Sequence, residues 1–92
     1  MKIIKRDDFS LALDNILDYI ARGGINYAVK FNRKLEKAIN NIPNFPYKSR
    51  KSLYHDDENI RDYIFKGYTI PYLIDSEKKQ IVLLDIFKWV NK

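Results

Sequence analysis

A short basic and aromatic segment in the middle of the chain is the part of the sequence best equipped for chemistry. Within nine residues it gathers flat side chains and cations: Tyr47, Lys48, Arg50, Lys51, Tyr54 and His55. Cations pair with phosphates and flat side chains stack on bases, so the segment predicts a surface that binds RNA or another target. Such groups can also steady a scissile phosphate and shuttle protons without a metal. A flexible loop that only adds soluble charge is the alternative.

The other enzyme signatures that a sequence can show are missing. The glycines, Gly23, Gly24 and Gly67, form no phosphate-binding loop. One histidine and no cysteine leave no usual zinc site and no thiol nucleophile. The acidic run at residues 56–58 is typical of a solvated turn rather than a cation site. We therefore expect neither a metal nor a cofactor.

Two helices are expected before this segment, and they must support it. Asp7 and Asp8 supply N-cap chemistry and negative charge for the first helix, which has one apolar stripe and ends at Gly23-Gly24. The second helix begins near Asn26, again has one apolar face, and ends at Pro43. The two-glycine link predicts that the helices fold back as a hairpin.

Extended segments flank the helices. Ile3-Ile4 between lysines predicts a short strand within residues 1–5. The last third contains three runs rich in β-branched and aromatic residues, at 60–65, 68–75 and 81–89. Short polar links between them predict an antiparallel three-stranded meander. The fold class is therefore α+β: a short N-terminal strand and a helical hairpin packed on one face of a mainly antiparallel sheet.

Three details of the meander carry further expectations. Pro71 lacks an N–H, so its strand should have an open edge or a bulge at that point. Residues 81–84 are apolar at every position, which predicts a central strand covered on both faces. The tyrosines of the strands, Tyr63, Tyr68 and Tyr72, are expected to fill the core rather than to act as catalytic acids.

Length and charge limit the classes of function. Ninety-two residues predict a single domain over 1–92. No apolar run is long enough for a membrane span, and the N-terminus becomes acidic too early for a signal peptide, so we expect a cytoplasmic protein. The net charge of +5 is compatible with a polyanion or with an acidic partner protein.

Three blocks of the sequence resemble the RelE/ParE superfamily, the toxins of type II toxin–antitoxin (plasmid stabilisation) systems. They are residues 9–21, which resemble the first helix; residues 35–43 with the basic loop after them; and residues 60–88, which resemble the closing hairpin. The resemblance implies a growth inhibitor neutralised by a cognate antitoxin whose tail wraps over it. Exposed helix faces and a sheet edge near Pro71 would be docking surfaces.

The superfamily contains two mechanisms. RelE-like members cut mRNA on the ribosome, using basic residues on the sheet and a tyrosine in a C-terminal segment, whereas ParE-like members bind DNA gyrase. Here Thr69 stands where the family has a strand arginine, and the chain ends at Lys92 without a late tyrosine. We therefore favour a ParE-like gyrase inhibitor that is not an enzyme. Its expected binding residues are Lys48, Arg50, Lys51, Tyr54 and Trp89.

Two alternatives stay open. The first is a RelE-like, metal-independent endoribonuclease that acts on mRNA in the ribosome, with Arg61, Lys66 and Lys88 as substitute catalytic cations. The second is a non-toxic interaction domain on the same scaffold, because a fold does not determine a function.

Overall fold

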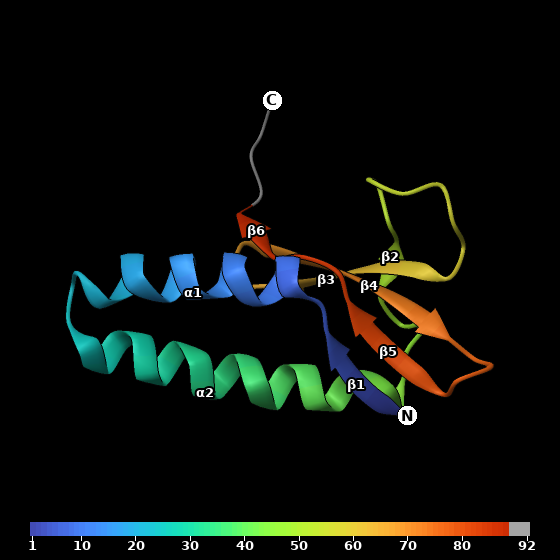
Figure 1. Cartoon of the computed structure of the whole chain (residues 1–92), viewed down its shortest axis with the longest axis horizontal. Coiled ribbons are helices and arrows are strands. Elements are labelled where there is room, and N and C mark those ends of the chain that lie inside the picture. Colours follow the sequence, from blue (N-terminus) through green and yellow to red (C-terminus); the bar gives the residue numbers. More distant parts are fainter. Residues whose placement is uncertain (89–92) are drawn as a thin grey trace.

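Two helices pack side by side against one face of a six-stranded sheet in the computed structural model, which describes residues 1–88 (Figure 1). The elements in chain order are β1 (Lys2–Lys5), α1 (Asp7–Ala21), α2 (Ile25–Asn41), a 3-10 turn η1 (Ile42–Asn44), β2 (Arg50–Lys51), β3 (Ile60–Phe65), β4 (Tyr68–Asp75), β5 (Gln80–Leu83) and β6 (Phe87–Lys88). This is the α+β fold expected from the sequence. Within residues 1–88, no helix has both the length and the apolar character needed to cross a bilayer.

The sheet contains the expected N-terminal strand and meander, together with two short strands that were not expected, β2 and β6. The run from residue 81, expected to form one strand, is divided into β5 and β6 because residues 84–86 do not continue the ladder. The strand order is β1-β5-β4-β3-β2, with β6 beside β4, so β3, β4 and β5 are neighbours. Their pairings are antiparallel, whereas β1 runs parallel to β5 with Ile3 opposite Ile81. The two-residue strand β2 forms because Arg50 and Lys51 lie antiparallel to Asp62 and Arg61 of β3.

The helical hairpin follows the apolar periodicity, with small corrections at its ends. The first helix buries Phe9 and Leu13. Asp7 and Asp8 lie inside its first turn, where their charge is favourable, but Arg6 is the N-cap residue and no side chain caps the helix. In the link between the two helices, Gly24 has a φ of 138°, a value that residues other than glycine rarely adopt.

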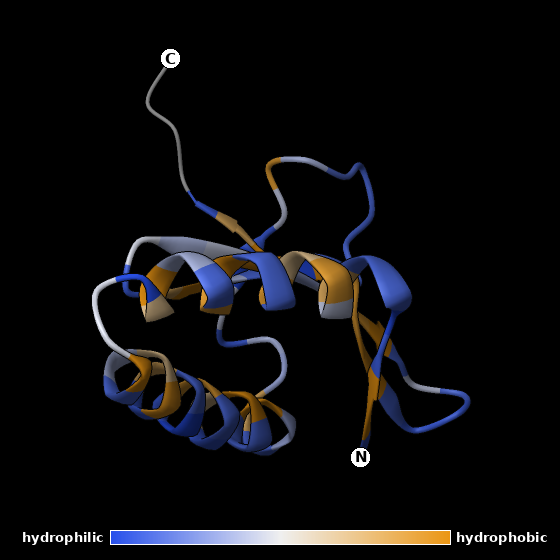
Figure 2. Cartoon of the chain, turned by 60° about the vertical axis from the view of Figure 1, so that its left-hand side comes forward, coloured by the Kyte–Doolittle hydropathy of each residue, from blue (hydrophilic) through white to orange (hydrophobic). Residues whose placement is uncertain are grey.

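The core lies between the hairpin and the inner face of the sheet. Alternate residues of β4, Ile70, Tyr72 and Ile74, are buried and face the helices together with Ile81 and Leu83 of β5. The expectation that the strand tyrosines fill the core is confirmed most clearly by Tyr72, which is fully buried. In Figure 2 the hydrophilic positions of α2 lie on the side turned away from this core.

Pro71 lies opposite a β-bulge. Tyr72 is paired with Leu83 and Thr69 with Phe87, so the two residues between them on β4 face three residues on the partner segment. The carbonyl of Pro71 points toward this segment and accepts the N–H of Leu84 at 2.9 Å. The missing N–H of the proline therefore falls where the ladder is interrupted. Of the two alternatives expected at Pro71, the bulge is confirmed. The open edge is wrong, because β4 is an internal strand.

The prediction for residues 81–84 holds only for one face. β5 is internal, with Ile81 and Leu83 buried toward the helices. Val82, which alternation places on the outer face, is only half-buried. The coverage of both faces that the apolar run predicted is therefore wrong, because both helices pack on the same side of the sheet.

Candidate functional site

The basic and aromatic segment belongs to a loop that bends around the β2 edge of the sheet. This edge loop, residues 45–59, connects η1 to β3 and includes β2 (Figure 1). On the helix side of the sheet, the Tyr72 hydroxyl donates a hydrogen bond to the Pro46 carbonyl. On the outer side, the Asp62 carboxylate accepts one from the Leu53 N–H at 3.0 Å. The loop is therefore held from both faces of the sheet.

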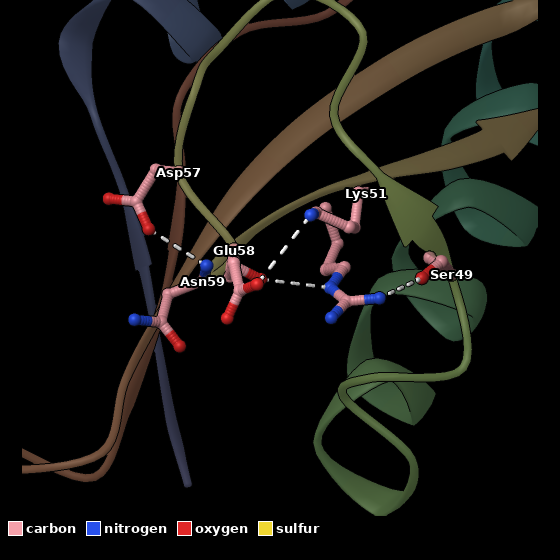
Figure 3. Close-up of polar contacts among 6 residues, drawn as sticks. Ser49, Lys51, Asp57, Glu58 and Asn59 are labelled. Atoms are coloured by element: carbon pink, nitrogen blue, oxygen red, sulfur yellow. Dashed lines mark hydrogen bonds and ion pairs between the residues drawn. The ribbon is translucent and has the colours of Figure 1, made fainter.

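Arg61 forms a third attachment of the edge loop. Its Nε donates to the Glu58 carbonyl at 3.1 Å and its guanidinium donates to the Ser49 carbonyl at 3.2 Å (Figure 3). The guanidinium also lies over the Tyr47 ring, 5.0 Å from its centroid. A planar, multiply donating cation suits this role because it binds two carbonyls and an aromatic face at once. Arg61 thus joins the two ends of the edge loop.

The acidic residues of the edge loop form contacts with other residues of the same loop. Glu58 forms an ion pair with Lys51 at 3.7 Å, and the Asp57 side chain accepts the N–H of Asn59 at 2.8 Å (Figure 3). The Asp57–Asn59 contact is a local turn of the kind that aspartate favours. The carboxylates of these two residues are therefore used by the loop itself, as a solvated turn would use them.

Asp62 is a buried carboxylate that was not expected from the sequence to belong to the site. Its exposed fraction is 1%, and its Oδ2 lies 3.0 Å from the Leu53 nitrogen and 3.7 Å from the Arg50 guanidinium. Its Oδ1 has no hydrogen-bond partner among the described residues. A buried charge is costly without partners, so these two contacts tie the edge loop to β3.

Tyr72 holds the loop from the core. Burial raises the pKa of its hydroxyl above the ordinary value of 10.0, and the nearby positive charge of Arg61 opposes part of that rise. The hydroxyl is therefore a stable donor at neutral pH. It shows no feature of a catalytic acid, because it is directed at a backbone carbonyl and not at solvent.

The edge loop exposes large apolar side chains beside its cations. Phe45 is 68% exposed and Leu53 is 69% exposed, while Tyr47 and Tyr54 are about half exposed. Tyr54 also packs edge-on against Phe87 of β6, with ring centroids 5.0 Å apart. The tyrosines of this loop were expected as binding residues from the sequence, whereas Phe45 and Leu53 were not. The sequence does contain a signal for them, because the segment has no apolar periodicity. Large apolar residues in such a segment are expected to be exposed and available to a partner.

A hollow of about 420 Å³ adjoins the edge loop on the helix side. Its lining includes Ala38 of α2, Phe45 and Lys48 of the loop, and Tyr63 and Ile64 of β3. In the described part of the chain no strand pairs with β3 beyond Asp62 on this side, since β2 covers only Arg61 and Asp62. The hollow is therefore bordered by a short open strand edge.

The three cations expected in a nuclease site do not converge. Arg61 lies near the start of β3, and Lys66 directly follows its last residue. Along an extended strand these five residues span about 16 Å. Lys88 is opposite Tyr68 and so belongs to the Lys66 end. Thr69, at the position of the strand arginine, is fully buried, and its hydroxyl has no partner among the described residues.

Four of the five residues expected to bind the target lie together on the edge loop, and the fifth lies outside the described residues. Lys48, Arg50, Lys51 and Tyr54 all lie on the edge loop, where Arg50 and Lys51 are already paired with carboxylates. Trp89 lies outside the described residues.

Comparison with known proteins identifies the family. The sequence model described as "ParE toxin of type II toxin-antitoxin system, parDE" matches residues 3–88, nearly the whole chain. The chain belongs to the ParE toxin family. It is therefore the toxin component of a type II toxin–antitoxin system, which implies an antitoxin partner. The predicted RelE/ParE resemblance is thereby confirmed, and the match falls on its ParE branch.

A solved structure supports the fold of this ParE-family chain. The chain is similar to one described as "Chromosomal ParDE TA system from P. aeruginosa", with a TM-score of 0.79 and 15% sequence identity. The likeness covers 98% of this chain and 97% of the other. No curated protein sequence matches the chain significantly.

Proposed function

We propose that this ParE-family toxin arrests growth by binding DNA gyrase through the edge loop, without cleaving RNA. The observation that carries the proposal is the exposure of Phe45 and Leu53 on a loop that is held from both faces of the sheet. Apolar and aromatic anchors dominate the energy of protein interfaces. A loop already fixed in position loses little conformational entropy when a protein binds it.

The arrangement of the cations supports a binding role over the nuclease alternative. Arg61 is engaged with two backbone carbonyls, and Lys66 lies at the far end of β3. The buried Thr69 places no cation where the family's strand arginine would stand. Phosphodiester cleavage needs several groups held around one phosphate, and these residues do not provide that arrangement.

The antitoxin is proposed to cover the hollow beside β3 and thereby mask the edge loop. The open strand edge there offers backbone groups to an extended segment, and Ile64 on that edge is exposed. Lys48 and Arg50 in the lining of the hollow would attract an acidic tail. Because Phe45 lines the same hollow, one occupant would block access to the target-binding loop.

A gyrase supercoiling assay with matched variants tests the proposal. The test variant is Phe45→Ala with Leu53→Ala, and the control is Leu11→Ala with Ile25→Ala, whose side chains are 65% and 67% exposed on the helices. If the loop carries the interface, the test variant needs at least about tenfold more protein for half-inhibition, while the control does not change. Equal effects of the two variants would contradict the loop assignment. Cleavage of mRNA in a translating extract, with gyrase unaffected, would support the nuclease instead.

A further inference from the structure

The outward face of α2 carries a stripe of cations. The stripe consists of Lys30, Arg33, Lys34 and Lys37, all of them exposed. At 3.6 residues per turn these four positions fall within an arc of about 100°. The buried residues of the helix, Ala28, Leu35 and Ile39, lie on the opposite side. The four cations therefore lie together on the side of α2 that faces away from the core, and Figure 2 shows that this side is hydrophilic.

The charges of this stripe are not neutralised by the rest of the described chain. None of the four cations forms an ion pair within residues 1–88. The single acidic residue of α2, Glu36, lies off the stripe and is paired with Lys5 at 2.6 Å. The stripe is thus available to an external anion.

The composition of the stripe favours phosphate over a protein surface. The other positions of α2 on the same arc are Asn26 and Asn41, and the exposed Tyr27 borders the arc, so no apolar side chain lies at the centre of the stripe. Protein interfaces need apolar or aromatic anchors at their centre. Lysine, arginine and asparagine, in contrast, are the side chains that contact nucleic-acid phosphates.

The geometry suits a duplex lying along the helix. Lys30 to Lys37 spans about 10 Å of helix. Each strand of duplex DNA carries one charge per about 3.4 Å of axis, so about three phosphates of one strand would lie beside the stripe. The outward side of α1 is acidic, with exposed Asp7, Asp14 and Asp18, and repels a polyanion. Of the two helices, only α2 therefore offers a surface that attracts DNA.

We propose that the α2 stripe binds the phosphate backbone of duplex DNA as a second contact, separate from the edge loop. The choice of DNA as the polyanion rests on the proposed function, because a gyrase inhibitor meets its target on duplex DNA. The stripe concentrates the toxin there without reading sequence, since backbone contacts carry no base information.

Salt-dependent binding of the isolated chain to a labelled 20-base-pair duplex tests the stripe. Each cation that contacts a phosphate adds about 0.9 to the slope of log K against log salt. Lys30→Gln with Lys34→Gln and Lys37→Gln is expected to lower that slope by about 2.7. Glutamine retains helix propensity, so the helix is preserved. The control removes three charges elsewhere, with Lys2→Gln, Lys78→Gln and Lys79→Gln at the exposed start of β1 and the β4–β5 turn.

The expected result is a reduced slope for the stripe variant and an unchanged slope for the control. Equal losses in both variants would show a general charge effect and overturn the proposal. Binding of the stripe to poly-glutamate but not to the duplex would also overturn it, in favour of an acidic protein. The assay contains no gyrase, so the two proposals fail separately. Gyrase inhibition without DNA binding refutes only the stripe, and DNA binding through the stripe without gyrase inhibition refutes only the proposed target.

Discussion

Arg61 and Tyr72 face each other across β3 and β4, and both donate hydrogen bonds to backbone carbonyls of the edge loop. Arg61 binds the carbonyls of Ser49 and Glu58, and Tyr72 binds that of Pro46. One cross-strand pair therefore holds the loop at three points. The loop that exposes Phe45 and Leu53 is a supported surface, and its support comes from residues of β3 and β4.

Replacing Tyr72 by phenylalanine removes the hydroxyl that binds the Pro46 carbonyl. We expect the free energy of unfolding at pH 7 to fall by about 1 kcal/mol, the usual net value of one hydrogen bond. Urea denaturation of both proteins measures this difference. A variant as stable as the parent would show that the hydroxyl does not hold the loop.

The stability of Tyr72→Phe should also depend less on pH than that of the parent under alkaline conditions. Burial raises the pKa of Tyr72 above 10.0, so folding favours the protonated hydroxyl. Its contribution is complete below pH 10 and is lost as the pH rises through the raised pKa of the folded state. The parent should therefore lose more stability above pH 10 than Tyr72→Phe loses. Equal alkaline slopes in urea denaturation would contradict this assignment.

Replacing Arg61 by lysine keeps the charge but loses the two directed hydrogen bonds. We expect faster amide hydrogen exchange in residues 47–59, with little change in α1 and α2, because the loss is local to the edge loop. Lys34→Ala, a change of an exposed cation on α2, is the control and should leave the loop unchanged. If Arg61→Lys exchanges like the parent, Arg61 is not a support of the loop.

Replacing Asp62 separates its two contacts. Asp62→Asn keeps a side-chain oxygen for the Leu53 N–H but loses the charge that faces Arg50. Asp62→Ala loses both contacts and leaves the part-buried Leu53 N–H without its acceptor, at a cost of about 1 kcal/mol. Thermal unfolding should rank the proteins parent, Asn, Ala in order of decreasing stability. An alanine variant more stable than the asparagine variant would show that the buried carboxylate is not a support.

Local patterns predicted the regular elements of the chain well. The bounds of β3 and β4 follow from β-branched and aromatic runs separated by the Lys66-Gly67 turn, and both runs coincide with the strands. The helical hairpin follows from two apolar stripes and a glycine link. The bulge opposite Pro71 was expected because a proline cannot continue a ladder there.

The supports of the site were not predictable from those patterns, because they depend on contacts between distant residues. Asp62 follows Arg61 and lies, by alternation, on the outer face of β3, where a polar side chain is ordinarily exposed, yet the edge loop buries it. Arg61 was expected to be a catalytic cation in the nuclease alternative, and only the fold reveals its contacts with Ser49 and Glu58. A periodic pattern assigns a face to a residue but does not show which loop covers that face.

The measurement that tests the central claim most directly is the order in which macromolecular synthesis fails after the chain is induced alone in a bacterium. Labelled thymidine and labelled methionine are followed together in the same culture. A toxin of the ParE family that acts on gyrase predicts an early fall in thymidine incorporation, with methionine incorporation falling later. An early fall in methionine incorporation, with DNA synthesis continuing, would contradict the account and point to cleavage of mRNA.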